Sequence, residues 1–379
     1  MSTAADGARR YIGLMSGTSM DGVDGALVTF SAAGASTLAF ASRDMPAPLR
    51  RVLADLQSSG PDEIARAALA ANALADLYAD LALELLERGA AFDPDTAADV
   101  VIGAHGQTVR HRPELGYTVQ LLNGARLAER SGLTVVCDFR SADVAASGQG
   151  APLVPAYHAD AFGREGVRRA LVNVGGIANI SVLAPGAATI GYDTGPGNVL
   201  MDEWCQHHRQ QPFDRDGAWA ASGTVHAGLL AALLDEPYFA RPTPKSTGRD
   251  LFNAAWLAQR LSLLAHAPGP GDVQATLAEL TAVTIARACA AGDCREVFVC
   301  GGGARNAHLM RRLEALCRPA VVDTTAALGV PPQAVEAVAF AWLARQRMLG
   351  LPGNLPAVTG AEGPRVLGAV YPAPPAAGG

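Results

Sequence analysis

The sequence is poor in charge and in aromatic side chains, and it has no long uninterrupted apolar run. Charged residues make up 17% and aromatic residues 6% of the 379 positions, against 49% apolar residues, which excludes a disordered chain. No segment reaches about 18 apolar residues without a polar interruption, so we expect no membrane partner. Basic runs are also lacking, and the net charge of −6 argues against nucleic acid, although a local site for an anionic nucleotide stays open.

The cysteines lack any pattern of a metal or disulfide framework. There are six, without a CxxC pair or zinc-ligand spacing, and several lie inside expected strands or helices, as Cys300 does. We expect reduced, mostly buried thiols. The N-terminal residues do not resemble a secretory signal, because Asp6, Arg9 and Arg10 precede only a short apolar strand. A cytoplasmic protein is therefore expected.

Short apolar segments predict the same order of elements twice, and the length suits two domains. The first copy comprises strands at 11–15, 25–30, 37–41, 99–102, 117–121 and 133–137, with helices at 60–89 and 125–130. The second comprises strands at 170–174, 177–183, 188–192 and 296–300, with helices at 198–208, 219–234, 251–264, 272–291, 306–317 and 332–349. The repeat predicts two α/β domains that face each other across a ligand-binding cleft.

The loop between the first two strands reads Ser16-Gly17-Thr18-Ser19-Met20-Asp21-Gly22-Val23-Asp24. Glycines let backbone N–H groups approach an oxyanion, hydroxyls add donors, and an aspartate can hold a divalent cation. The loop is not a Walker A motif, because it lacks the lysine and the following helix. Since turns favour the same residues, an ordinary hairpin turn is an open alternative to a phosphate site.

Three further glycine-rich segments follow expected strands. Gly175-Gly176 is either a tight turn or a source of donors for a phosphate. In the segment 192–198, which opens a helix and so aims N–H groups at an anion, Asp193 is either a general base or a cap. The three consecutive glycines of the segment 300–306 are conformationally costly, which favours close contact with a nucleotide over a simple loop.

Polar residues near other strand ends are candidates for substrate binding. His105, Gln107 and Thr108 offer hydrogen bonds to a polyhydroxylated ligand. Arg140 matches a carboxylate bidentately, although a salt bridge explains it equally well. Glu336 lies on an apolar helix, either at a polar edge or in a site. The segment 245–250 resembles a phosphate loop but lacks the upstream strand and the glycine spacing, so a helix N-cap at Ser246 or Thr247 is the simpler interpretation.

In combination these motifs are specific. From Ile12 to about Tyr371 the sequence resembles the anhydro-N-acetylmuramic acid kinase family, within the sugar kinase/heat-shock ATPase/actin superfamily. The motifs that carry the resemblance are residues 13–24, 104–108, 138–140, 148–155, 173–179, 193–198, 244–249, 300–306, 335–337 and 354–361. Two departures are Cys137 and Ser147, which stand where the family has glycine.

The resemblance implies a fold of two duplicated actin-like (ribonuclease H-like) α/β domains that flank a central nucleotide and substrate cleft. The N-terminal domain would comprise residues 1–147 with a C-terminal segment at about 351–379. The C-terminal domain would comprise residues 148–350 with a helical insertion. The family also implies a homodimer.

The implied activity uses ATP and Mg²⁺ to phosphorylate O6 of 1,6-anhydro-N-acetylmuramic acid while water opens the anhydro bridge, in peptidoglycan recycling. Asp193 would deprotonate the water, with Glu336 in a supporting role. Arg140 would pair with the lactyl carboxylate, and His105, Gln107 and Thr108 would line the same pocket. Asp21 would position Mg²⁺. The implied ATP-binding residues are Gly17, Thr18, Ser19, Met20, Asp21, Gly22, Val23, Asp24, Gly175, Gly176, Gly195, Gly197, Asn198, Gly301, Gly302, Gly303 and Asn306.

Two other functions are consistent with the same motifs. A kinase for a different anhydro sugar, such as levoglucosan, would act on a substrate without the lactyl carboxylate. A nucleotide-switched protein, such as a chaperone ATPase domain or an actin-like subunit, would hydrolyse ATP slowly without sugar.

Overall fold

The computed structural model describes residues 9–17, 20–31, 34–89, 100–243 and 245–375. The chain divides into two compact units, residues 1–161 with 334–379 and residues 162–333. These boundaries differ from the expected ones, because residues 148–161 and 334–350 belong to the first unit. The physical reason is that helix α14 (Val335–Leu349) packs on the sheet of the first unit.

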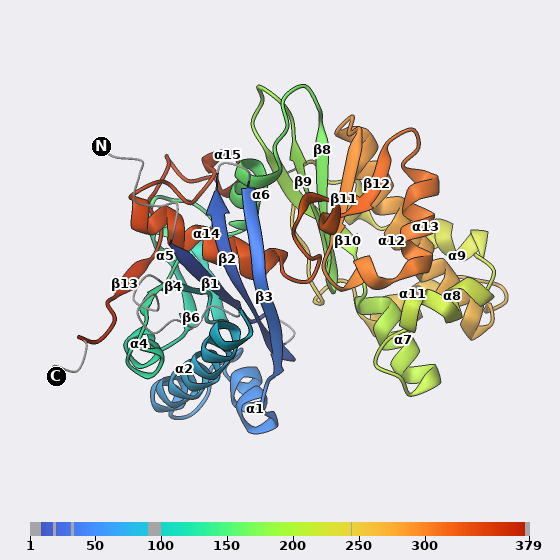
Figure 1. The fold of residues 1–379 in the computed structure, drawn as a ribbon. Coiled ribbons are helices and arrows are strands. Elements are labelled where there is room, and N and C mark those ends of the chain that lie inside the picture. Colours follow the sequence, from blue (N-terminus) through green and yellow to red (C-terminus); the bar gives the residue numbers. More distant parts are fainter. Residues whose placement is uncertain (1–8, 18–19, 32–33, 90–99, 244, 376–379) are drawn as a thin grey trace. The chain divides into compact units, whose positions relative to one another are not determined.

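The first unit is built on a six-stranded sheet with the order β13-β7-β4-β1-β2-β3 (Figure 1). Strands β1, β4 and β7 are parallel, whereas β2 runs antiparallel to both β1 and β3. The strands are β1 (Arg10–Met15), β2 (Gly22–Ser31), β3 (Gly34–Asp44), β4 (Val100–Ala104), β7 (Thr134–Cys137) and β13 (Ala369–Tyr371). A separate hairpin pairs β5 (Gln107–Arg112), which the sequence did not predict, with the expected β6 (Tyr117–Leu121).

Helix α2 (Glu63–Arg88) covers one face of this sheet, as its apolar spacing predicts. Leu74, Leu81 and Leu85 are fully buried against the sheet, whereas Ile64 is 88% exposed, so the first turn lies outside the core. The other helices of this unit are α1 (Ala47–Asp55), α4 (Gly124–Ser131), α5 (Ser141–Ala145), α6 (Val154–Phe162) and α15 (Pro356–Thr359).

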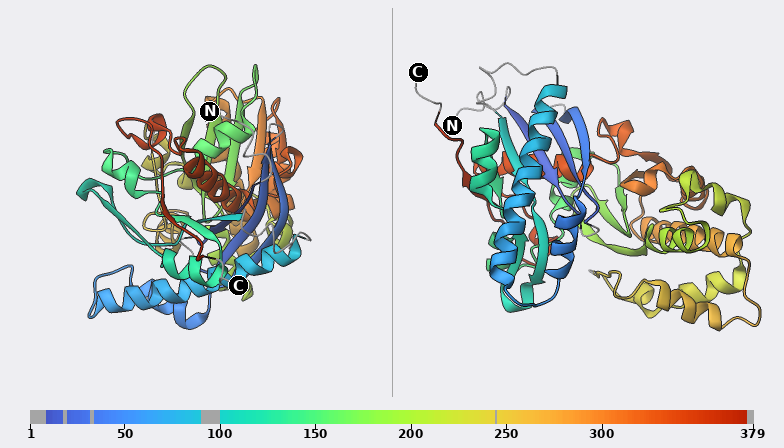
Figure 2. Two further views of the ribbon diagram at one scale, coloured as in Figure 1. Left: turned by 60° about the vertical axis from the view of Figure 1, so that its left-hand side comes forward. Right: turned by 90° about the horizontal axis from the view of Figure 1, so that it is seen from below.

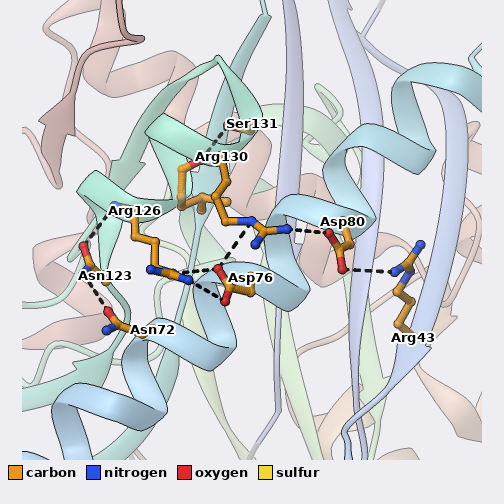
Figure 3. A network of polar contacts seen from close by, with 9 residues as sticks. Arg43, Asn72, Asp76, Asp80, Asn123, Arg126, Arg130 and Ser131 are labelled. Carbon is orange, nitrogen blue, oxygen red and sulfur yellow. Dashed lines mark hydrogen bonds and ion pairs between the residues drawn. The ribbon is translucent and has the colours of Figure 1, made fainter.

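Ion pairs fasten α2 to its neighbours at the surface of the unit (Figure 3). Arg126 of α4 forms a bidentate pair with Asp76 of α2, at 2.7 and 2.9 Å. The pKa of Asp76 lies below its ordinary value, chiefly because of this hydrogen-bonded guanidinium. Asp80, one turn further along α2, pairs with Arg130 of α4 and with Arg43 of β3. Since these side chains are partly exposed, each pair contributes at most about 1 kcal/mol.

The opposite face of the sheet carries α14, which approaches the strands unusually closely. Gly13 of β1 and Gly103 of β4 are direct neighbours in the parallel pairing, and both face the helix. A Cβ atom on Gly13 would lie 1.6 Å from the carbonyl oxygen of Ala337, and one on Gly103 would lie 2.1 Å from that of Phe340. The absence of two side chains therefore allows the helix backbone to rest on the sheet, with α2 on the other side (Figure 2).

The second unit repeats the strand order and directions of the first. Its sheet has the order β10-β9-β8-β11-β12, in which β9 is antiparallel to β8 and β10 while β8, β11 and β12 are parallel. This corresponds to β3-β2-β1-β4-β7, so the predicted duplication of an α/β domain is confirmed. The strands are β8 (Arg169–Val174), β9 (Ile177–Leu183), β10 (Ile190–Pro196), β11 (Glu296–Cys300) and β12 (Val321–Thr324).

Helices dominate the rest of the second unit, as expected for a helical insertion. Helices α12 (Pro270–Ala291) and α13 (Ala307–Leu316) cover one face of the sheet. A second core joins α12 to α7 (Val199–Arg209), α8 (Ala218–Ser222), α9 (Ala227–Leu234), α10 (Pro237–Ala240) and α11 (Ala254–Ser262). The single helix expected at 219–234 was wrong: the chain breaks at Gly223, where a Cβ atom would lie 2.2 Å from the oxygen of Gly271.

Two expectations from composition can be compared with the described residues. All six cysteines are buried and free, as predicted. Within the described ranges no single helix is long and apolar enough to cross a membrane, and one bent pair, 215–222 with 227–234, passes that test by length and composition only.

The close approach of α14 predicts that Gly13→Ala is strongly destabilising. The added methyl group would overlap the Ala337 carbonyl. Overpacking typically costs about 1–3 kcal/mol, and so close an approach to the backbone should place Gly13→Ala at about 3 kcal/mol. The free energy of unfolding, measured by urea denaturation, checks this. Gly269→Ala is the control, because the nearest neighbour of the added methyl group would be 3.9 Å away. Since Gly269 is the N-cap of α12, where alanine is less favourable than glycine, this change should cost no more than about 1 kcal/mol. Similar costs for the two variants would contradict the argument.

Candidate active site

The first glycine-rich loop is shorter than the sequence suggested. Strand β2 begins at Gly22, so Gly22, Val23 and Asp24 belong to the sheet, and the side chain of Val23 is fully buried. Val23 therefore cannot meet a ligand through its side chain. Thr18 and Ser19 lie outside the described residues. Met20 turns the chain with a φ of 54° and donates its N–H to the oxygen of Gly17 at 3.2 Å.

The base of this loop is fixed by buried hydrogen bonds. The Ser16 hydroxyl donates to the Gly106 oxygen at 2.9 Å and accepts from the Tyr78 phenol at 3.1 Å. Gln107 donates from Nε2 to the Gly17 oxygen at 3.1 Å. The loop from 17 to 21 therefore stands on a rigid base, with the Asp21 side chain exposed. An exposed carboxylate next to this hydrogen-bonded base is compatible with the expected magnesium role.

Two carboxyl groups and one guanidinium lie together on the α14 side of the first sheet. The pKa of Glu336 is raised, first by burial and next by Asp24, while Arg140 opposes the shift. Asp24 accepts a hydrogen bond from the Ser42 hydroxyl at 2.5 Å. The close packing of α14 fixes the position of Glu336, because the next residue, Ala337, is the one whose carbonyl lies against Gly13. The polar-edge alternative for Glu336 is thus disfavoured.

Arg140 rests on a neutral histidine. Its Nε and one terminal nitrogen lie 3.1 and 2.9 Å from His105 Nε2, and its other terminal nitrogen donates to the Gly150 oxygen at 2.8 Å. Since a guanidinium only donates, His105 Nε2 must be the unprotonated nitrogen. Burial, and then the charge of Arg140, lower the pKa of His105 to about 3. Burial lowers the pKa of Arg140 itself to about 10, so it stays cationic at neutral pH.

His105 and Gln107 are more buried than substrate-binding residues usually are. Their side chains are 6% and 1% exposed, and they hold Arg140 and Gly17 in place. Thr108 is partly exposed, and its hydroxyl accepts from Gln120 at 3.2 Å. Two atoms, His105 Nδ1 and Gln107 Oε1, are buried without a hydrogen-bond partner among the described residues. These contacts favour a supporting role for both side chains.

Asp143, which no motif of the sequence marks, organises the segment around Arg140. Its carboxylate is fully buried and accepts from Gly150 N at 2.7 Å, Asn354 Nδ2 at 2.6 Å and the Thr359 hydroxyl at 2.7 Å. Gly150 in turn offers its carbonyl to Arg140. Asp143 thereby connects the 147–150 loop to the C-terminal segment and fixes one acceptor of the guanidinium.

In the second unit, the Gly175-Gly176 turn is joined to the start of α7. The Gly175 oxygen accepts from Asn198 N at 2.8 Å. The Gly176 oxygen accepts from Gly197 N at 2.9 Å and from Val199 N at 3.1 Å. These three N–H groups are therefore occupied, of which only that of Val199 belongs to α7, and the expected anion site at this helix terminus stays a prediction. A Cβ atom on Gly176 would lie 3.7 Å from the Arg249 guanidinium, so a cation that the sequence analysis did not select lies beside this turn.

Asp193 lies in strand β10, not in the loop after it. The pairing with β9 shifts register between Asp193 and Gly195, which forms a bulge. Thr247 donates its backbone N–H to Asp193 Oδ2 at 3.0 Å, and the Tyr238 phenol donates to the Asp193 carbonyl at 2.7 Å. The pKa of Asp193 is raised by burial, and the Thr247 N–H partly offsets the shift. The carboxylate does not cap α7, because Asn198 is the residue at that cap.

The structure explains the three consecutive glycines, 301 to 303, in different ways. Gly301 has a φ of 78°, and a Cβ there would lie 2.3 Å from Asn173 Oδ1. A Cβ on Gly303 would lie 2.4 Å from the Val174 side chain. Packing inside the unit thus requires these two glycines, as it requires Gly195, whose Cβ would lie 2.7 Å from Phe239. Only Gly302, with Asn198 at 3.5 Å as its nearest neighbour, is left to face a ligand.

A pocket of about 310 Å³ brings three predicted ATP-binding residues together in the second unit. They are Asn198, Gly302 and Asn306, and Asn306 also caps α13 through Leu309 N at 3.0 Å. The remaining lining residues, which the sequence analysis did not select, are Met201, Asp202, Phe213, Asp214, Arg215, Asp216 and Arg305. Burial raises the pKa of Asp202 to about 7, with Arg249 opposing and Asp214 adding to the shift. The pocket has the size and mixed lining that suit a small ligand.

Comparisons of the sequence with known proteins give the same family that these motifs indicate. A family model described as anhydro-N-acetylmuramic acid kinase matches residues 9–373. A protein of that name from Bordetella petrii is 58% identical over 370 residues, 96% of this chain and 97% of its own. One from Albidiferax ferrireducens is 52% identical over 390 residues, 96% of this chain and 99% of its own. Among solved structures, the ADPNP-bound activator of the 2-hydroxyisocaproyl-CoA dehydratase from Clostridium difficile is 12% identical, with a TM-score of 0.47 over 90% of this chain and 96% of that chain.

The three hydrogen bonds to Asp143 predict a large stability loss for Asp143→Asn. An amide has only one oxygen, so at least one buried donor loses its acceptor, at a cost of about 2–3 kcal/mol. Thr359→Val is the control, because it removes one donor and leaves Gly150 bound, and it should cost about 1 kcal/mol. Urea denaturation gives both values, and equal losses would mean that the Gly150 contact contributes nothing.

Proposed function

Because the chain belongs to the anhydro-N-acetylmuramic acid kinase family, we propose that it converts 1,6-anhydro-N-acetylmuramic acid and ATP to N-acetylmuramic acid 6-phosphate and ADP. The full-length family match carries this proposal. The same proposal covers a cytoplasmic role in peptidoglycan recycling and a homodimer, which stay predictions.

In the proposed reaction Asp193 is the general base. Water adds to C1 as the C1–O6 bond breaks, its proton passes to the Asp193 carboxylate, and O6 takes the γ-phosphoryl group as ADP leaves. A raised pKa suits this role, because a carboxylate that binds a proton more readily is a stronger base. The Thr247 N–H occupies Oδ2, and among the described residues Oδ1 has no hydrogen-bond partner. Oδ1 is therefore the oxygen proposed to receive the proton.

Arg140 and Glu336 of the first unit are proposed to act on the sugar. The two hydrogen-bond acceptors of Arg140, His105 Nε2 and Gly150 O, are uncharged. Glu336 and Asp143 interact with its charge electrostatically, and the guanidinium is proposed to pair in addition with an anionic group such as the lactyl carboxylate. Glu336, with its raised pKa, is proposed to support the water as a second acid or base, while His105, Gln107 and Thr108 keep Arg140 and the loop at 17–21 in position.

Polar and glycine-rich residues are proposed to bind the nucleotide. Asn198, Gly302 and Asn306 of the 310 Å³ pocket suit the nucleoside, and the glycine-rich segments at 17–24 and 175–176 suit the phosphates. Mg²⁺ bound to ATP needs only one or two protein carboxylates, and the exposed Asp21 fits that requirement. The ion would neutralise phosphate charge.

An isotope experiment tests the reaction. The enzyme with ATP, Mg²⁺ and the anhydro sugar in ¹⁸O-water should give a 6-phosphorylated product labelled at C1, detected by mass spectrometry. Asp193→Asn should lower turnover by about a thousandfold or more while nucleotide binding persists. Label in inorganic phosphate, with the sugar unchanged, would indicate an ATPase and overturn the proposal.

The role of Arg140 predicts selective loss of sugar affinity. Arg140→Ala should raise the KM for the muramic substrate by about tenfold or more, because a charge-assisted pair is lost. Levoglucosan, which has no carboxylate, is the control substrate and should be used equally poorly by both proteins. If wild type prefers levoglucosan, or if Arg140→Ala changes only the melting temperature, the carboxylate contact is refuted.

A further inference from the structure

The chain contains a single lysine, Lys245, and its ammonium group is used inside the second unit. Nζ donates to the carbonyl oxygens of Tyr238 and Phe239 at 3.2 and 2.9 Å, within α10. It also lies 4.9 Å from the centre of the Tyr238 ring. A cation that bonds carbonyls of a helical turn and stacks on an aromatic face is well anchored. The expectation of an N-cap at Ser246 or Thr247 was wrong, because Asn253 caps α11.

The segment that Lys245 anchors is the one that holds Asp193. Asp193 donates its backbone N–H to the Lys245 oxygen at 3.1 Å, and two residues further on Thr247 N donates to Asp193 Oδ2. Tyr238, whose carbonyl accepts from the Lys245 ammonium, donates its phenol O–H to the Asp193 carbonyl. Both groups that fix Asp193 therefore come from elements that Lys245 ties together.

We infer that Lys245 is a positioning residue for Asp193: its ammonium ties the 245–247 segment to α10, so that the Thr247 N–H fixes Oδ2 and directs Oδ1. This inference rests on the proposed role of Asp193 as general base. Lys245 acts through Thr247 and Tyr238, without touching the carboxylate in any hydrogen bond of the described residues.

The surroundings of Asp193 make the inference testable through pH. The neighbouring titratable groups are Tyr192 of β10 and Tyr238 of α10, whose pKa values are both raised first by burial, with Lys245 and Arg241 as the nearby cations. Since the pKa values of both phenols are raised, neither tyrosine changes charge in the acidic range. A hydrogen bond to a carboxylate lowers its pKa, so loss of the Thr247 contact raises it further.

The main variant is Lys245→Met, which keeps the length of the side chain and removes its charge and donors. We expect kcat to fall by about tenfold or more and the acidic limb of the kcat/KM profile to move to higher pH by about one unit. The KM for ATP should change little. Lys245→Arg, which keeps a cation and its donors, should restore most of the rate. Arg241→Met is the matched control: Arg241 lies 5.7 Å from the same Tyr238 ring but is outside the 245–247 segment, so neither kcat nor the limb should change.

A second measurement uses the wild-type enzyme and so does not depend on whether Lys245→Met folds. Acetylation of the folded wild-type enzyme by an amine-selective ester can alter only Lys245 among its side chains, and Lys245→Arg, which has no lysine, controls for the α-amino group. Acetylated wild type should lose rate and shift its limb, whereas treated Lys245→Arg should not. This measurement decides the matter if Lys245→Met does not fold.

The outcomes separate the inference from the function on which it rests. If Asp193→Asn retains turnover, the proposed function fails. If Asp193→Asn is inactive but folded Lys245→Met, or the acetylated enzyme, keeps the wild-type rate and acidic limb, only the positioning role of Lys245 is overturned. A lower melting temperature with an unchanged limb would likewise reduce Lys245 to a structural anchor.

Discussion

The first unit depends on the contact between the backbone of α14 and the sheet beneath it. Gly13 and Gly103, paired across β1 and β4, leave the space that the carbonyls of Ala337 and Phe340 fill. A helix seated at this depth brings Glu336 within electrostatic reach of Asp24 and Arg140 and places the Phe340 ring 4.8 Å from His105. The chemistry proposed for this unit is therefore a consequence of two missing side chains.

The strands were largely predictable, because buried strands in this chain are short apolar runs between small residues. Strands β6, β9 and β11 were predicted at the residues where they lie. Elements with little apolar content were not: β5 contains Arg110 and His111, and β12 has Val321 exposed. The predicted second domain wrongly included α14, which belongs to the first unit. The sequence does not reveal that a helix late in the chain packs on strands from its beginning.

The candidate site was predictable where motifs mark it and not where the fold assembles it. Asn198, Gly302 and Asn306 were selected for their motifs, and they line one pocket. Phe213 and Asp214 of the same pocket carry no local signal, because a loop brings them there. Asp143 acts through other residues, and Lys245 is inferred to do so. Such residues look ordinary in sequence, although a lone lysine is itself unusual. The glycine triplet was interpreted too simply, since two of its members serve internal packing.

The pairing of Arg140 with His105 has a consequence for robustness. An imidazole that binds its proton only near pH 3 can never add a second positive charge beneath the guanidinium under living conditions. The imidazole under Arg140 consequently stays uncharged at neutral and mildly acidic pH. The proposed recognition of an anionic sugar substituent by Arg140 is therefore insulated from the change of charge that a histidine with an ordinary pKa would undergo near neutral pH.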